Sequence, residues 1–192
     1  MQKSQIRTLV LFTLIISTIF LRIIPHPANF TPIAAVGLFG AAYFSRKWQA
    51  LILPLVALFV SDLIINNTIY KEMNPGFTFF YKGFYWQYLS IIFITLIGFV
   101  FYQKKVSLLN IGLGVLSSTV IFYLVSNFGV WASGILYPLT PEGLGMALLA
   151  GVPFIKNFLI STCVYSLGIF GVFYLLQSNF KIIESKLKHD VI

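Results

Sequence analysis

The feature that most constrains this chain is a series of long apolar runs that are almost free of charge. The sequence has 192 residues, of which 58% are hydrophobic and only 9% charged, and its mean hydropathy is +0.91. Soluble domains carry about 25% charged residues, whereas about 20 apolar residues cross the hydrocarbon core of a bilayer as a helix. We therefore expect an all-α integral membrane protein whose surroundings are the lipid bilayer.

The apolar runs predict one transmembrane domain, residues 1–192, built as a bundle of six transmembrane helices. Thr31 followed by Pro32 predicts an N-cap and a first helical residue for the second span. The lysines within residues 178–192 predict that this segment is a basic cytoplasmic tail. The predicted spans cover residues 6–24, 32–44, 48–67, 84–102, 108–128 and 152–177.

A short extra outer helix is predicted near residues 141–150, in the last connection between spans. Thr140 and Pro141 repeat the N-cap and first-residue signal, and Glu142 places a carboxylate near the positive end of the helix. The segment could also continue into the sixth span with a kink at Pro153. We favour a separate helix in the membrane interface.

The basic residues are unequally divided between the two sides of this predicted bundle. Nine fall in one set of segments and four in the other, and an excess of Lys and Arg in short loops marks the cytoplasmic side. This predicts a multi-pass protein of the cytoplasmic (inner) membrane with both termini in the cytoplasm, and no nucleic-acid partner. The larger set is Lys3, Arg7, Arg46, Lys47, Lys104, Lys105, Lys181, Lys186 and Lys188, and the smaller is Arg22, Lys71, Lys82 and Lys156.

Polar side chains inside or beside the spans arrive at one depth, on the extracytoplasmic side, from several different segments. Polar groups are costly in hydrocarbon, so such a collection indicates a functional site. The cytoplasmic half is almost wholly apolar, which argues against a continuous ion pore. The predicted substrate-binding residues are His26, Asn29, Asp62, Asn127, Trp131 and Asn157.

Most of these residues also have a structural interpretation. His26, which lies between two prolines, could be a rigid element of the first outer loop. Asp62 could pair with Arg22 or Lys156 instead of meeting a ligand. The two asparagines of the fifth and sixth predicted spans could bridge helices. The outer aromatic residues, Trp131 among them, could form an interfacial belt or wall an apolar pocket.

Catalytic and metal-binding signatures are missing from the sequence. It contains no H-E-x-x-H, G-x-S-x-G, C-x-x-C or phosphate-binding glycine loop. Two distant histidines, His26 and His189, and the lone Cys163 do not make an ordinary zinc or haem site. We therefore expect no enzyme activity, no catalytic residue, no metal and no cofactor.

Two motifs carry a resemblance to a known family. Residues 25–32, PHPANFTP, and residues 126–131, SNFGVW, resemble the signature of an uncharacterised bacterial integral-membrane family. The layout of that family is similar to the S components of energy-coupling-factor (ECF) vitamin transporters. Those are six-helix proteins with a small-residue second span, then a basic turn, then a third span ending in an acid. The resemblance implies a substrate-binding subunit that partners an energising module.

Three functions follow as hypotheses. The first is a capture or uptake subunit that binds a small, vitamin-like nutrient, partly aromatic or cationic, in a pocket on the extracytoplasmic side. The alternative is a non-catalytic accessory or structural subunit of a larger membrane protein complex. The third is an intramembrane enzyme with Asp62 and His26 as acid and base.

Overall fold

The computed structural model describes residues 3–73 and 76–179, although several α1 side chains lie outside the description, as does the predicted tail beyond Asn179. Within these residues the chain is helical and contains no strand. An all-α architecture is therefore confirmed. The elements are α1 (Lys3–Ile23), α2 (Ile33–Tyr43), α3 (Lys47–Thr68), the 3-10 turn η1 (Lys71–Met73), α4 (Phe84–Phe101), α5 (Leu108–Ala132) and α6 (Pro141–Asn179).

The number of helices suited to cross a membrane differs from the predicted six. Among the described residues, four helices are long and apolar enough, namely α3, α4, α5 and α6. The six-span prediction is therefore corrected to four. α2 has 11 residues and so is about 16 Å long at 1.5 Å per residue, about half of the ~30 Å hydrocarbon core.

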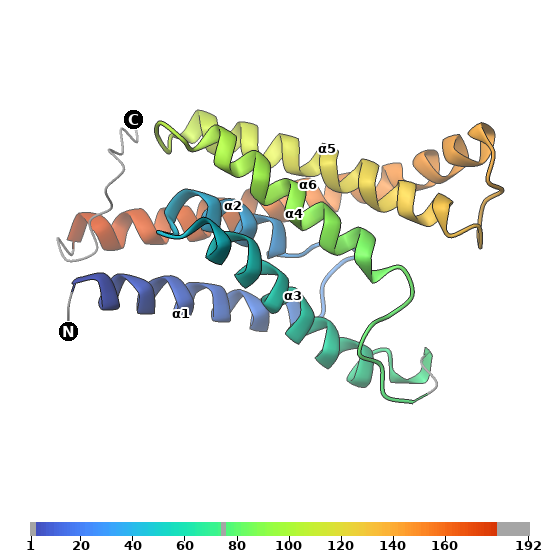
Figure 1. Cartoon of the computed structure of the whole chain (residues 1–192), viewed down its shortest axis with the longest axis horizontal. Helices are drawn as coiled ribbons and strands as arrows, with labels where there is room; N and C mark the ends of the chain where they lie inside the picture. The colour runs from blue at the N-terminus through green and yellow to red at the C-terminus, as the bar shows by residue number, and fades with distance from the viewer. Residues whose placement is uncertain (1–2, 74–75, 180–192) are drawn as a thin grey trace.

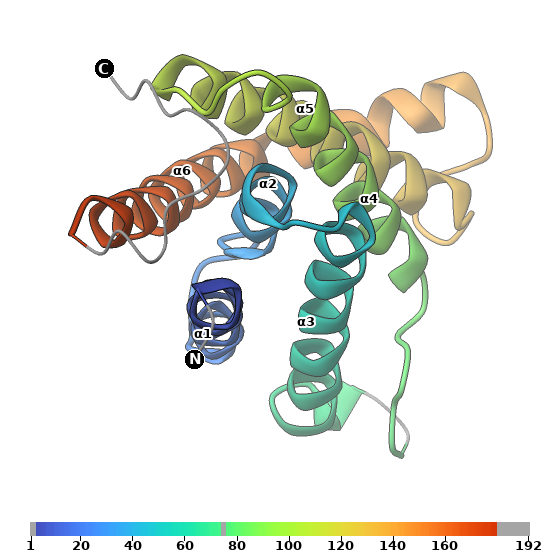
Figure 2. The ribbon, with the colours of Figure 1, turned by 60° about the vertical axis from the view of Figure 1, so that its left-hand side comes forward.

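α2 can be shorter than a membrane span because protein, and not lipid, surrounds it. Ten of its residues are buried, and it contacts α3, α4 and α6; Figure 2 shows it between the other helices. Small residues permit this close packing. A Cβ added at Gly37 would lie 2.8 Å from Thr95 Oγ1, and one at Gly98 would lie 2.8 Å from Ala41 Cβ. A helix enclosed in this way needs no lipid-facing length.

The predicted cap of α2 is also corrected. The N-cap position is held by Pro32, with no capping side chain, and Val36 N donates to Pro32 O at 3.1 Å. The hydroxyl of Thr31 is buried and has no hydrogen-bond partner. The helix starts one residue later than predicted, because the backbone carbonyl of Pro32 already accepts the first helical bond.

The separate helix near residues 141–150 does not form, and that prediction is wrong. α6 runs without interruption over 39 residues and contains Pro153. Its predicted start is confirmed, since Gly143 N donates to Thr140 Oγ1 at 3.2 Å. The helix continues through Gly151 because this glycine packs against α5, where an added Cβ would lie 2.4 Å from Asn127.

The connections divide the bundle into two unlike ends (Figure 1). The long connections 69–83 and 133–140 lie at one end, which we call the loop end, and the connection 24–32 lies on the same side of the bundle but nearer its middle. The short connections 44–46 and 102–107 lie at the other, the turn end, together with the first residues of α1.

The longest connection at the loop end is fixed in place by α3. The carboxamide of Asn67 donates to Thr78 O and accepts from Thr78 N, both at 2.8 Å. Phe80 packs against Phe59 of α3 and stacks on Phe84 of α4, with ring centroids 5.3 and 4.4 Å apart. These contacts place the residues just before α4 against the bundle.

Candidate functional site

A cavity of about 790 Å³ opens at the loop end, where all three long connections meet α4, α5 and α6. Its wall combines aromatic rings with amide, hydroxyl and ammonium groups. The principal polar and aromatic lining residues are Asn29, Tyr81, Lys82, Tyr85, Trp86, Gln87, Phe122, Ser126, Asn127, Ser133 and Phe154.

Asn29 reaches this cavity from the first connection in an unusual backbone conformation. Its φ is 61°, a left-handed value that asparagine tolerates better than most residues. Two side chains of α6 fix the surrounding backbone. Asn157 Nδ2 donates to Ala28 O at 3.1 Å, and Ser161 Oγ donates to Asn29 O at 3.5 Å. Asn157 thus positions the connection and does not line the cavity.

Asn127 lines the cavity from α5 and is closely confined. Its Nδ2 donates to Tyr123 O at 2.7 Å, which uses one of the two amide hydrogens. Across from it lies Gly151 of α6, whose missing side chain leaves the space that the carboxamide occupies. On the neighbouring turn, Gly129 leaves space for the indole of Trp86 in the same way.

Gln87 lines the cavity from the first turn of α4, and Tyr81 orients it. The hydroxyl of Tyr81 donates to Gln87 Oε1, so the Nε2 group of Gln87 is left to donate. Burial, and then the nearby carboxylate of Asp62, raise the pKa of Tyr81 above its ordinary value. The hydroxyl therefore keeps its proton and remains a donor.

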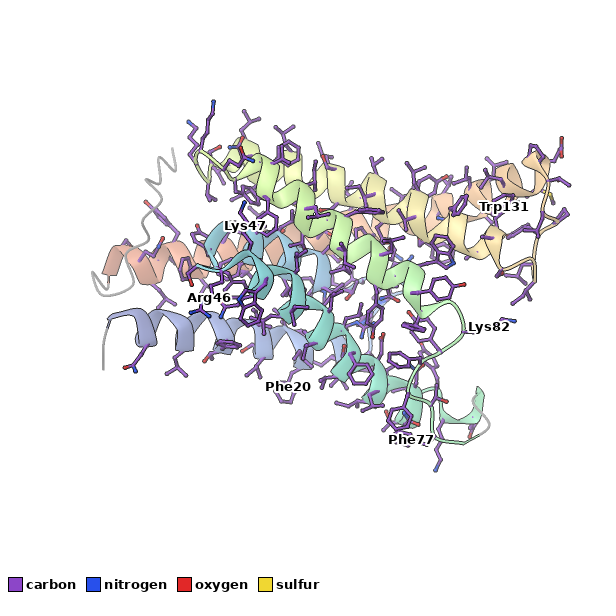
Figure 3. The ribbon with its side chains drawn as sticks, viewed as in Figure 1. Phe20, Arg46, Lys47, Phe77, Lys82 and Trp131 are labelled. Carbon is purple, nitrogen blue, oxygen red and sulfur yellow. The ribbon has the colours of Figure 1, made fainter. Side chains whose placement is uncertain are left out.

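One buried ring of the cavity wall, Phe122, is stacked on a second buried ring. Phe122 of α5 and Phe158 of α6 lie with centroids 4.1 Å apart and planes 8° from parallel. Lys82 is an exposed lining residue at the loop end, where its side chain extends away from the ribbon (Figure 3), whereas the labelled Arg46 and Lys47 lie at the turn end.

A second polar cluster lies at the loop end but outside the cavity. Arg22 of α1 and Asp62 of α3 form an ion pair at 2.6 Å, with only 10% and 7% of their side chains exposed. Arg22 also donates to Ser61 Oγ, and the hydroxyl of Tyr88 approaches Asp62 Oδ2 at 3.4 Å. Of the two predicted pairings of Asp62, the structure forms the one with Arg22.

The structure therefore separates the predicted site residues. Asn29 and Asn127 share the cavity, while Asp62 and Asn157 hold helices and backbone together. His26 is exposed, and its ring nitrogens lie 2.9 and 3.1 Å from the carbonyl oxygens of Pro27 and Arg22. The indole of Trp131 donates to the carbonyls of Pro138 and Thr140, so it holds the third connection.

Comparison with protein families gives one match, which covers nearly the whole chain. Residues 2–185 match a family described as a family of unknown function, DUF6580. The chain belongs to this family. No curated protein and no solved structure matches the sequence. For this DUF6580 protein, the cavity and its lining are therefore the starting point for assigning a function.

Sequence reasoning missed Gln87 and gave Lys82 and Tyr81 no individual role in binding. Gln87 is a polar residue in the first turn of an apolar helix, and the rule that selected Asn127 would have found it. From the sequence, Lys82 is only a charge in a loop, because its place in the same cavity lining as Asn29 depends on how two distant connections pack. Among the described residues, no group of three His, Cys, Asp or Glu side chains could hold a metal ion.

Proposed function

We propose that this protein is a membrane subunit that captures a small solute in its loop-end cavity. The observation that carries the proposal is the volume of the cavity together with the kinds of residues that line it. Small-molecule sites are concave, about 300–1,000 Å³, mostly apolar, and equipped with a few placed polar groups. The cavity has about 790 Å³ and joins aromatic walls to the amides of Asn29, Gln87 and Asn127.

The division of polar groups supports capture over catalysis. Asp62, the acid that the enzyme hypothesis needs, is buried against Arg22, and the ring nitrogens of His26 face backbone carbonyls. The cavity amides, in contrast, keep donors and acceptors that a bound solute can use. This lining therefore supports the capture of a solute without a chemical reaction.

We also propose that the loop end faces the extracytoplasmic side of the cytoplasmic membrane and that both termini are cytoplasmic. Arg46, Lys47, Lys104 and Lys105 lie in the short connections at the turn end or beside them, as the positive-inside bias requires of cytoplasmic loops. In the ECF-like form of this proposal, an energising partner would drive uptake after the solute is bound.

The test is ligand-dependent stabilisation of the purified chain in lipid nanodiscs, screened against vitamins, nucleobases and other small nutrients. A ligand that binds the folded state at about 100 times its Kd adds about 2.7 kcal/mol to the free energy of unfolding. Ala132→Trp places an indole in the cavity wall and should abolish the stabilisation. Ala150→Trp, on an exposed α6 position outside the lining, is the matched control.

Lys104→Ala combined with Lys105→Ala should leave the ligand-dependent stabilisation unchanged, because both residues lie at the turn end. Equal stabilisation of the wild type and the Ala132→Trp variant would refute capture in this cavity, as would a screen in which no solute stabilises the wild type.

An accessory subunit is the second candidate, and one surface feature favours it. An apolar groove of about 330 Å³ runs over α4, α5 and the start of α6, with Phe93, Leu124 and Leu148 in its lining. If a partner helix fills it, purification in mild detergent should yield a complex of fixed stoichiometry. Leu124→Trp should release that partner without changing solute binding.

A further inference from the structure

From the charges of the cavity wall we infer the class of solute, which is a planar aromatic molecule bearing a carboxylate or a similar anionic group. The inference rests on the proposed function. It names what the same cavity selects, and it assigns Lys82 as the residue that recognises the anion.

The first argument is the sign of the charge in the wall. Lys82 lines the cavity, and no acidic residue does. Of the five acids in the sequence, Glu184 and Asp190 lie outside the described residues. Glu72 and Glu142 lie elsewhere on the surface, and Asp62 is compensated by Arg22 at 2.6 Å. An ammonium group without a competing carboxylate favours an anion.

The second argument is the orientation of the neutral polar groups. Tyr81 binds Gln87 through Oε1 and so presents the Nε2 donor. Asn127 has used one Nδ2 hydrogen on Tyr123 O and retains the other. Donors from these two amides and from Lys82 match the several acceptor lone pairs of a carboxylate.

The third argument is the shape of the apolar wall. Tyr85, Trp86 and Phe154 line the cavity, and the lining residue Phe122 is stacked on Phe158. Aromatic rings prefer offset or edge-on contact with other rings, so they suit a flat ring system. The anionic group would then lie toward Lys82 and the ring toward Phe122.

The experiment compares three probes that share one ring system and differ in charge, namely 2-naphthoate, 2-naphthamide and 2-naphthylmethylamine. Binding is measured by calorimetry on the intact chain in phosphatidylcholine nanodiscs, and protein-free nanodiscs correct for partitioning. We expect naphthoate to bind about tenfold more tightly than the amine, because charge-assisted hydrogen bonds exceed neutral ones.

Lys82→Gln should reduce this preference to less than about twofold. Lys71→Gln should preserve it, because Lys71 is an equally exposed lysine at the same end of the bundle but outside the lining. The use of a zwitterionic lipid keeps the membrane surface from producing the same preference.

The outcomes separate this inference from the proposed function. If the amine or the amide binds best, or if Lys82→Gln leaves the preference intact, the solute class is wrong. Capture still holds in that case, provided that Ala132→Trp abolishes binding. If Ala132→Trp changes the affinity for none of the three probes, these probes do not bind in the cavity, and the assignment of Lys82 fails with them.

Discussion

Two groups of polar side chains lie at the loop end of this bundle, and they differ in how much of their hydrogen-bonding capacity the protein itself uses. In the first group, the opposite charges of Arg22 and Asp62 meet at 2.6 Å, and Ser61 and Tyr88 add further contacts. In the second group, the amides of Gln87 and Asn127 are each fixed by one bond and face a cavity.

The difference is that the protein itself satisfies the polar side chains of the first group and leaves part of the second free. A buried ion pair joins α1 to α3, and breaking it leaves a charge without compensation. Under the proposed function, an amide fixed on one side is a preorganised contact for a solute, since its rotamer is set before the ligand arrives. Tyr81 links the two groups, because it binds Gln87 and its pKa is raised by burial and then by the carboxylate of Asp62.

The largest effect on stability is expected when the ion pair of the first group is broken. Arg22→Met leaves the carboxylate of Asp62 buried without its partner, and the free energy of unfolding should fall by about 3–5 kcal/mol. Adding Asp62→Leu should restore most of the loss, because the uncompensated charge is then removed. Denaturant unfolding in detergent measures both variants, and an Arg22→Met protein as stable as the wild type would contradict the comparison.

An intermediate effect is expected in the second group. Gly151→Ala places a Cβ 2.4 Å from the end of the Asn127 side chain, so that carboxamide must move. Overpacking of this kind costs about 1–3 kcal/mol, and solute binding should weaken with it. Gly171→Ala, where nothing lies within 4 Å, is the control. If binding survives with Asn127 displaced, this asparagine does not contact the solute.

The smallest effect concerns Tyr81, the residue that links the two groups. Tyr81→Phe removes the donor to Gln87 Oε1, so the free energy of unfolding should fall by about 0.5–1.5 kcal/mol. The affinity for solute should fall as well, because the Gln87 amide is then free to rotate. A loss of stability with unchanged affinity would show that Gln87 is not a binding residue.

Much of the fold could be predicted from local patterns. The apolar runs gave α3, α4 and α5 to within a few residues, and the Thr140 cap marked the start of α6. The errors arose where packing overrides a local signal. The helix predicted near residues 141–150 does not end there, because Gly151 is the point at which α6 packs on Asn127. The small second helix does not need the length of a span, because protein surrounds it.

For the candidate site, the sequence predicted a group of polar residues at one end but did not show which of them face each other. Asn157 finds its acceptor in Ala28, 129 positions away, and no local pattern encodes such a pairing. Asn29 and Asn127 share a cavity only because the first connection packs against α5 and α6.

By itself, the sequence determined the helical class and indicated a lipid environment, because transfer into hydrocarbon depends on composition and spacing alone. Tertiary structure decided that Asp62 is neutralised, that α2 is enclosed, and that Lys82 and Gln87 join the cavity. Hydrogen bonds and ion pairs act over a few ångströms, so their partners are chosen only when distant segments are brought into contact.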